Sequence, residues 1–274
     1  MAISVNQAFV TGYEKDVHEA FQRRGSKLRM MVRHAVDVVG STHVFQKVGT
    51  GTATTKGRNG NVTPMNVAHT NVTATLVDSY APDYADKLDL DKLTIDERKV
   101  LINAGAYALG RKVDADIITQ LDATTTTETS GTTGDFSLTK VLTAQAQLGN
   151  NDVFEAGRMY AIVPWTEWNK LMLVQQFAMA DWVNDKPWLE SGMAKRWLGT
   201  IWMPHSGLES LVAATVAKSY WWHESAVGNA MGTEIQTDVN WIPEKVAWLM
   251  NNMMSQGSIL IDANGVIEIR NTRA

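Results

Sequence analysis

A long polar stretch lies between two short segments with the composition of β-strands, and it constrains the fold more than any other feature. The strand-like segments are residues 43–48 and 71–77. Between them, residues 49–64 (GTGTATTKGRNGNVTP) offer almost nothing to bury. This pattern predicts a projecting hairpin with a polar tip, and an isolated two-stranded hairpin is at best marginally stable in water. We therefore expect the hairpin to lie on another body, such as a neighbouring copy of the chain.

Charge is distributed unevenly along the chain. The net charge is −4 over 274 residues, but residues 20–77 carry eight basic side chains and one acidic one. Residues 78–97 then carry seven acidic and two basic side chains. Such a split favours binding of nucleic acid or of a second copy, with two simply solvated faces as the alternative. For contacts between copies, the candidate residues are Arg23, Arg24, Lys56, Arg58, Asp86, Asp89 and Asp91.

Tryptophan is confined to the second part of the chain. All ten tryptophans follow residue 164, so a polar front precedes an aromatic-rich back. Because 45% of the residues are hydrophobic, the chain can bury a substantial core. Rows of tryptophan can line sugar-binding clefts, but packing in a core or an interface is their commoner use.

The sequence argues against several classes of site. Cysteine is absent, which excludes disulfides and thiolate metal ligands. The six histidines do not fall at helical ligand spacing, and no phosphate-binding loop or nucleophile-elbow motif is present. The first residues lack a signal-peptide core, and no apolar run approaches the roughly 20 residues that cross a bilayer. We expect no catalytic, cofactor-binding or metal-binding residues and no membrane contact.

Two helices are predicted in the first half of the chain. Residues 14–36 suggest a helix, interrupted near Gly25, with a basic face. A longer helix over residues 94–121 begins with Thr94 and Glu97, the spacing of a capping box. Gly105 inside this helix costs about 1 kcal/mol relative to alanine, so we expect close packing against another backbone there. Residues 123–134, which lack any periodicity, are predicted to form a loop.

Helices and strands are predicted to alternate from residue 136 onward. The expected helices are residues 137–149 and 165–176, and the expected strands are residues 158–164, 199–203, 211–222 and 236–242. Pro243 suits the first turn of a further helix, which Gly257 would end. Residues 258–262 and 266–270 are then expected to pair as a hairpin around Asn264 and Gly265, because Asn-Gly is the strongest short hairpin signal.

Three features together resemble one family, the major capsid proteins of tailed bacteriophages, which have the Hong Kong 97-type fold. The first is the order of basic arm, polar hairpin and long helix. The second is SYWWHESAVGNAMG (residues 219–232), which is similar to a strand and turn common in these proteins. The third is GSILIDANGVIEI (residues 257–269), which resembles their closing strands. YAIVPWTEWNKLM (residues 160–172) also looks like their strand, proline and helix segment.

The resemblance implies an α+β fold with four parts. Residues 1–42 would form an N-terminal arm and residues 43–80 the extended hairpin called the E-loop. Residues 81–134 and 235–274 would build a discontinuous peripheral domain with a long spine helix. Residues 135–234 would build the axial domain.

The resemblance also implies a function and partners. The chain would be a structural protein that self-assembles, through hexamers and pentamers, into the icosahedral head shell around double-stranded DNA. A separate scaffolding protein, a portal, a decoration protein and non-specific contact with packaged DNA are the expected partners, and the virion is the expected location. Two alternatives stay open: an encapsulin-like nanocompartment shell, and a tryptophan-rich carbohydrate-binding or carbohydrate-active domain.

Overall fold

A computed structural model describes residues 23–90, 92, 96–128, 134–178, 195–211 and 216–272. The chain divides into two compact units. The first unit contains residues 23–25 together with Ser79–Arg111 and Glu234–Met254. The second contains the described parts of Ser26–Asp78, Lys112–Thr233 and Ser255–Ala274.

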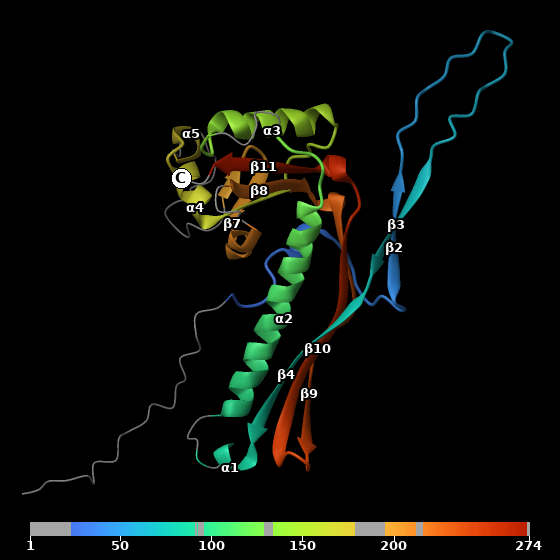
Figure 1. The fold of residues 1–274 in the computed structure, drawn as a ribbon. Helices are drawn as coiled ribbons and strands as arrows, with labels where there is room; N and C mark the ends of the chain where they lie inside the picture. Colours follow the sequence, from blue (N-terminus) through green and yellow to red (C-terminus); the bar gives the residue numbers. More distant parts are fainter. Residues whose placement is uncertain are drawn as a thin grey trace, which may run out of the picture. The chain divides into compact units, whose positions relative to one another are not determined.

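A mixed five-stranded sheet forms the centre of the second unit. Its strands run in the order β11 (Val266–Thr272), β8 (Val216–His223), β5 (Met159–Val163), β7 (Thr200–Pro204) and β6 (Lys195–Trp197). Only β5 and β7 are parallel; the other neighbouring pairs are antiparallel. The helices α3 (Leu138–Asn150), α4 (Trp165–Met172) and α5 (Gln175–Ala178) follow the predicted alternation. Figure 1 shows α3 lying along β11.

Four tryptophans of this unit, Trp168, Trp197, Trp202 and Trp221, belong to its core, whereas Trp182 and Trp188 lie outside the described residues. Trp202 and Trp221 are fully buried, with ring centroids 5.0 Å apart. Trp168 and Trp197 pack against Phe177 from two other elements. The prediction that tryptophan serves packing is confirmed for these residues, because rings that contact one another in a core cannot line a sugar cleft.

The helix α2 (Glu97–Asp122) confirms the long helix of the sequence, although Thr94 of the expected capping box lies outside the described residues. A four-stranded sheet has the order β1 (Arg33–Ala35), β9 (Val227–Ile242), β10 (Ala247–Leu260) and β4 (Val77–Asp86). A Cβ on Gly105 would collide with the Asn252 amide and lie 3.3 Å from the carbonyl oxygen of Ala81. The expected close approach at Gly105 is therefore present. The short helix α1 (Lys87–Leu90) follows β4.

The helix predicted from Pro243 to Gly257 is wrong, because this segment is the strand β10. Pro243 lies in a turn in which the Val246 amide donates to the Pro243 carbonyl oxygen and Val246 has a φ of 50°. Burial then alternates along β10, with Met250, Asn252, Met254 and Gln256 buried. Two of these four side chains are polar, and this hides the period-2 pattern that identifies a strand.

The predicted hairpin around Asn264 and Gly265 is also wrong. β10 and β11 belong to different sheets, and the 3-10 turn η5 (Ala263–Gly265) connects them. The Asp262 carboxylate accepts a hydrogen bond from the Asn264 amide at 3.1 Å, which caps this turn. A Cβ on Gly265 would lie 2.7 Å from that of Ala226. The glycine therefore permits close packing against η4 (Glu224–Ala226) and does not close a hairpin.

The helix predicted over residues 14–36 is contradicted where the structure describes it. Arg29–Met31 form the 3-10 turn η1, and Arg33–Ala35 form β1, which pairs in parallel with β9. The amides of Lys27 and Leu28 donate to a side-chain carboxylate, so they are not used in a helix. Residues 14–22 lie outside the described residues.

Candidate functional site

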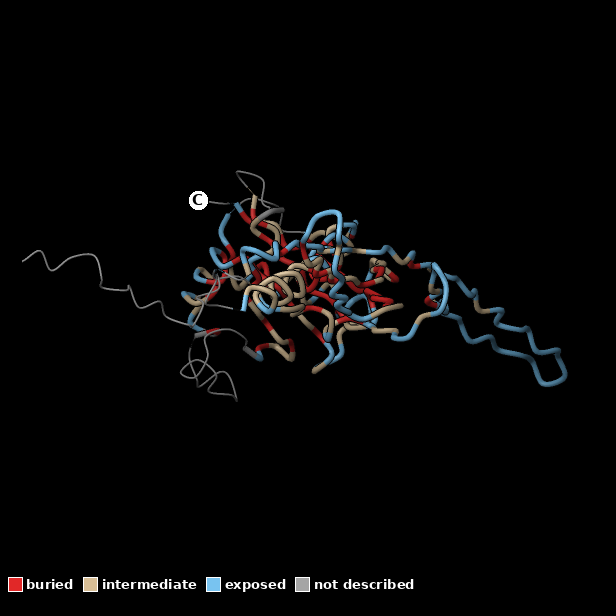
Figure 2. Tube along the Cα trace, turned by 90° about the horizontal axis from the view of Figure 1, so that it is seen from below, coloured by how far each residue is buried: buried red, intermediate tan, exposed pale blue. Residues whose placement is uncertain are grey.

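The polar hairpin is present, and its tip is almost wholly exposed. The strands β2 (Thr42–Val48) and β3 (His69–Thr75) pair in antiparallel register from Thr42 opposite Thr75 to Val48 opposite His69. All of residues 49–68 are exposed except Val67, which is half-buried (Figure 2). Lys56 and Arg58 are exposed on this tip. The tip thus presents backbone and basic side chains without any core of its own.

The root of the hairpin, in contrast, is firmly packed. Phe45 and Ala74 are buried in a small core with Ala230 and Ile261. A Cβ on Gly228 would lie 2.6 Å from the Phe45 ring, so only glycine allows the ring to lie there. The hairpin is therefore anchored at one end and free at the other.

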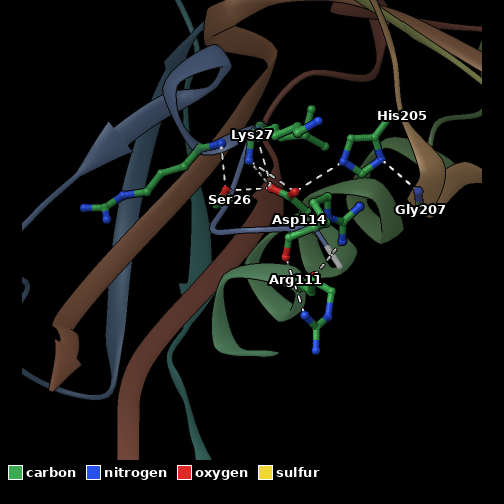
Figure 3. Close-up of polar contacts among 9 residues, drawn as sticks. Ser26, Lys27, Arg111, Asp114, His205 and Gly207 are labelled. Atoms are coloured by element: carbon green, nitrogen blue, oxygen red, sulfur yellow. Dashed lines mark hydrogen bonds and ion pairs between the residues drawn. The ribbon is translucent and has the colours of Figure 1, made fainter. Parts of the chain in front are cut away.

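A buried aspartate organises the segment that precedes the hairpin (Figure 3). Asp114 in α2 is fully buried, and its Oδ1 accepts from the Ser26 hydroxyl at 2.6 Å. The same oxygen accepts from the amides of Lys27 at 3.0 Å and Leu28 at 3.1 Å. Its Oδ2 lies 3.2 Å from Nε2 of His205, which is also buried. One carboxylate therefore ties α2 to residues 26–28, which precede η1, and to the loop after β7.

The contacts of His205 determine its tautomer. The Gly207 amide donates to Nδ1 of His205 at 3.1 Å, so Nδ1 carries no proton. Nε2 then carries the proton and donates it to Asp114. Burial alone would raise the pKa of Asp114, but the hydrogen bonds from His205, Ser26, Leu28 and Lys27 outweigh burial and lower that pKa below its ordinary value.

This lowered pKa predicts a specific pH dependence of stability. A carboxyl whose pKa is lower in the folded chain stabilises the fold above its unfolded pKa, about 3.9, and loses that contribution as the pH falls through the folded pKa. We expect the stability difference between the wild-type chain and Asp114→Asn to be constant above about pH 5 and to shrink below pH 4. Urea unfolding followed by circular dichroism across this range measures it, and a difference that grows with acidification would contradict the assignment.

Arg23 and Arg24 make contacts within their own unit. Nη2 of Arg23 donates to the Arg111 carbonyl oxygen at 3.4 Å, and Nη1 of Arg111 donates to the Arg23 carbonyl oxygen at 3.5 Å. The Arg24 guanidinium lies over the Tyr107 ring, 5.7 Å from its centroid. These contacts hold residues 23 and 24 against α2.

Two of the three acidic candidates, Asp86 and Asp89, line a cavity in the first unit. Its volume is about 450 Å³, and it is lined by Tyr84, Ala85, Asp86, Asp89, Leu90, Lys92 and Glu97. Asp86 caps α1 through the Leu88 amide at 2.8 Å, and Asp89 pairs with Lys92 at 3.2 Å. Asp91 lies outside the described residues. The structure thus brings two of the three acidic candidates to one hollow, where acidic groups outnumber basic ones.

The buried pair Asp114 and His205 was not predicted from the sequence. Asp114 occupies the apolar stripe of its helix, next to Val113 and one turn before Ile117 and Ile118, all of which are buried. An acidic residue on such a stripe needs buried partners, and this is the signal that the sequence offers. Among the described residues no cluster of histidine, aspartate and glutamate could hold a metal ion. None of the described helices combines the length and apolar character needed to cross a membrane.

Comparisons with known proteins agree on one group. The family model for phage capsid protein matches residues 5–273. A solved structure from Mycobacterium phage Che8 is similar, with a TM-score of 0.72, 15% identity and coverage of 96% of this chain and 97% of that one. The capsid of an empty GTA particle gives a TM-score of 0.73 and 15% identity, with 96% of each chain covered. The capsid of Ralstonia phage GP4 gives 0.72 and 10% identity, with 100% and 98% covered. No curated protein matches the chain.

Proposed function

Because the chain belongs to the phage capsid protein family, it is a structural protein of the virion shell, and we propose that its polar hairpin joins neighbouring subunits of that shell. The protein is a major capsid protein that self-assembles, and its fold is that of phage capsids. The match of the family over nearly the whole chain is the observation that carries this conclusion. A nanocompartment shell and a carbohydrate-binding domain are not favoured by these similarities.

Two features of the hairpin support a role in contacts between subunits. A rigid root and an exposed, coreless tip add interface without adding buried volume to the subunit. The tip carries Lys56 and Arg58, whereas the cavity beside α1 carries Asp86 and Asp89. We propose that the basic tip of one subunit approaches this acidic hollow of an adjacent one. Exposed ion pairs contribute about 0–1 kcal/mol each. They would therefore set the alignment of neighbouring subunits, while apolar burial supplies most of the affinity between them.

We propose that Arg23 and Arg24 play a second, smaller part in subunit contacts. Both already make contacts within their own unit, so an acidic neighbour would only add to those. We expect a separate scaffolding protein, a portal and a decoration protein as further partners, arranged around hexamers and pentamers. Contact with DNA is expected to be non-specific, because an acidic shell protein releases its cargo more readily than a basic one. We propose no catalytic role.

Backbone hydrogen exchange tests whether the tip is covered by a neighbour. We expect the amides of residues 50–66 to exchange fast in the free subunit, since that segment is exposed. In assembled shells, identified by electron microscopy, their exchange should slow by about tenfold or more, whereas the buried amides of β5 should exchange slowly in both states. Equally fast exchange of the tip in subunits and shells would contradict the proposal.

A further inference from the structure

The tip of the hairpin contains one of the two Asn-Gly pairs in the sequence. This pair, Asn59 and Gly60, lies in the exposed segment 49–68. Both residues belong to a turn in which the Gly60 amide donates a hydrogen bond to the Gly57 carbonyl oxygen at 3.0 Å. Water therefore reaches the side-chain amide of Asn59 and the backbone that follows it.

The second Asn-Gly pair, Asn264 and Gly265, is held more firmly. The Asp262 carboxylate accepts from the Asn264 amide, and the Asp262 carbonyl oxygen accepts from the Gly265 amide, both at 3.1 Å. Gly265 is also buried against Ala226. Its nitrogen cannot turn toward the Asn264 side chain without breaking these contacts. Gly60 would give up one exposed hydrogen bond, which is worth roughly two- to tenfold in an equilibrium constant.

We propose that Asn59 is a site of spontaneous deamidation in the unassembled subunit. The backbone nitrogen of Gly60 loses its proton to a solvent base and attacks Cγ of Asn59, and no Cβ crowds this nitrogen. The Cγ–Nδ2 bond then breaks, Nδ2 takes up a proton and leaves as ammonia, and a cyclic imide remains. Water opens this ring at either carbonyl carbon, which gives aspartate or isoaspartate. One primary amide and one water molecule thus become one carboxylate and one ammonium ion.

The modification would weaken the contact proposed for the hairpin, and this part of the inference rests on that proposed function. The tip carries Lys56 and Arg58 and no acidic residue, so one added carboxylate lowers its net charge from +2 to +1. The new charge would face Asp86 and Asp89 of the adjacent subunit. One exposed charge contact changes an association constant by about fivefold. Subunits that stay unassembled longest would therefore bind their neighbours most weakly.

Peptide mapping of the unassembled full-length chain tests the modification. The folded protein is kept at mildly alkaline pH for several days, and trypsin then releases residues 59–87. We expect this peptide to gain the mass difference between a carboxylic acid and a primary amide, with aspartate and isoaspartate both present at position 59. Asn264 should keep its amide in the folded chain and lose it in guanidinium chloride. Asn59 that keeps its amide in the folded chain but loses it in the unfolded one would overturn the proposal.

Gly60→Ala is the matched variant for the chemical step. A Cβ at Gly60 would lie 3.6 Å from the backbone nitrogen and oxygen of Gly57, an ordinary contact, so we expect the turn to be kept. The methyl group crowds the attacking nitrogen, and deamidation of Asn59 should slow several-fold without any change of charge. Freshly purified protein, digested in parallel, corrects for conversion during digestion. Equal rates in the variant and the wild type would contradict attack by the Gly60 nitrogen.

An assembly assay separates the modification from its effect on the shell. Asn59→Asp carries the added charge from the start, and it should need at least about fivefold more subunit to form shells than fresh wild-type protein. Aged wild-type protein should shift in the same direction, whereas aged Gly60→Ala should assemble like the fresh variant. If Asn59→Asp assembles like the wild type, the effect on the contact is wrong, even where peptide mapping confirms the deamidation. Hydrogen exchange at the tip tests the contact itself.

Discussion

Reversing the two charges at the hairpin tip, as Lys56→Glu with Arg58→Glu, should abolish shell formation and leave the subunit folded. The fold should survive because both side chains are exposed and far in sequence from the packed root. If each exposed pair changes from attraction to repulsion, each contact loses about 2 kcal/mol, roughly 30-fold in its association constant. The loss recurs at every equivalent contact of a shell. Electron microscopy of the purified variant measures it, with circular dichroism as the check on folding.

Three further variants make this result specific. Lys56→Gln with Arg58→Gln removes the attraction without adding repulsion, so assembly should be weakened but not abolished. Adding Asp86→Lys and Asp89→Lys to the charge-reversed tip should restore shells if the tip faces that hollow. Lys99→Glu changes an exposed charge on α2 and should leave assembly unchanged. Normal shells from the charge-reversed variant at ordinary salt would contradict the proposed contact.

The sequence predicts those elements whose pattern is set locally. β2, β3, β5 and α2 lie close to the expected residues, because their side chains alternate or repeat with a single period. β10 escapes such a prediction because methionine, leucine, alanine and glutamine also favour helices. Two of its buried positions are amides with partners from elsewhere: Asn252 accepts from the Thr237 hydroxyl at 2.6 Å, and Gln256 donates to Asp116 at 2.7 Å. A prediction from neighbouring residues in the sequence cannot identify partners that only the folded chain brings together.

The residues of the candidate site also differ in whether the sequence alone predicts their environment. Exposure of Lys56 and Arg58 follows from the absence of apolar neighbours in sequence, so it is predictable. The cluster around Asp114 is not, since it joins residues near 26, 114 and 205. The role of a buried polar residue can be inferred only when the residues that it contacts are known.

Replacing Asp114 by alanine should strongly destabilise the second unit. It leaves the Ser26 hydroxyl, two backbone amides and the His205 Nε2 proton without their acceptor. Each buried donor left unpaired costs about 1–3 kcal/mol, and because such losses are not additive we expect about 3–5 kcal/mol in total. The midpoint of urea unfolding of the unassembled subunit measures the loss.

The variant Asp114→Asn keeps the size and shape of the side chain and removes its charge, so it measures the contribution of the charge to stability. The amide oxygen of the new side chain can still accept from Ser26, Lys27 and Leu28, but its NH₂ group would face the Nε2 proton of His205. If His205 changes to the other tautomer, Nε2 can accept from the new NH₂ group, but the proton on Nδ1 then faces the Gly207 amide. Two hydrogen-bond donors therefore face each other in either tautomer, and we expect a loss of about 1–2 kcal/mol. Asp135→Ala is the control, because it removes only an exposed ion pair with Lys170 and should leave the midpoint of unfolding nearly unchanged. If Asp114→Ala unfolds at the same urea concentration as this control, the buried carboxylate does not stabilise the attachment of residues 26–28 to α2.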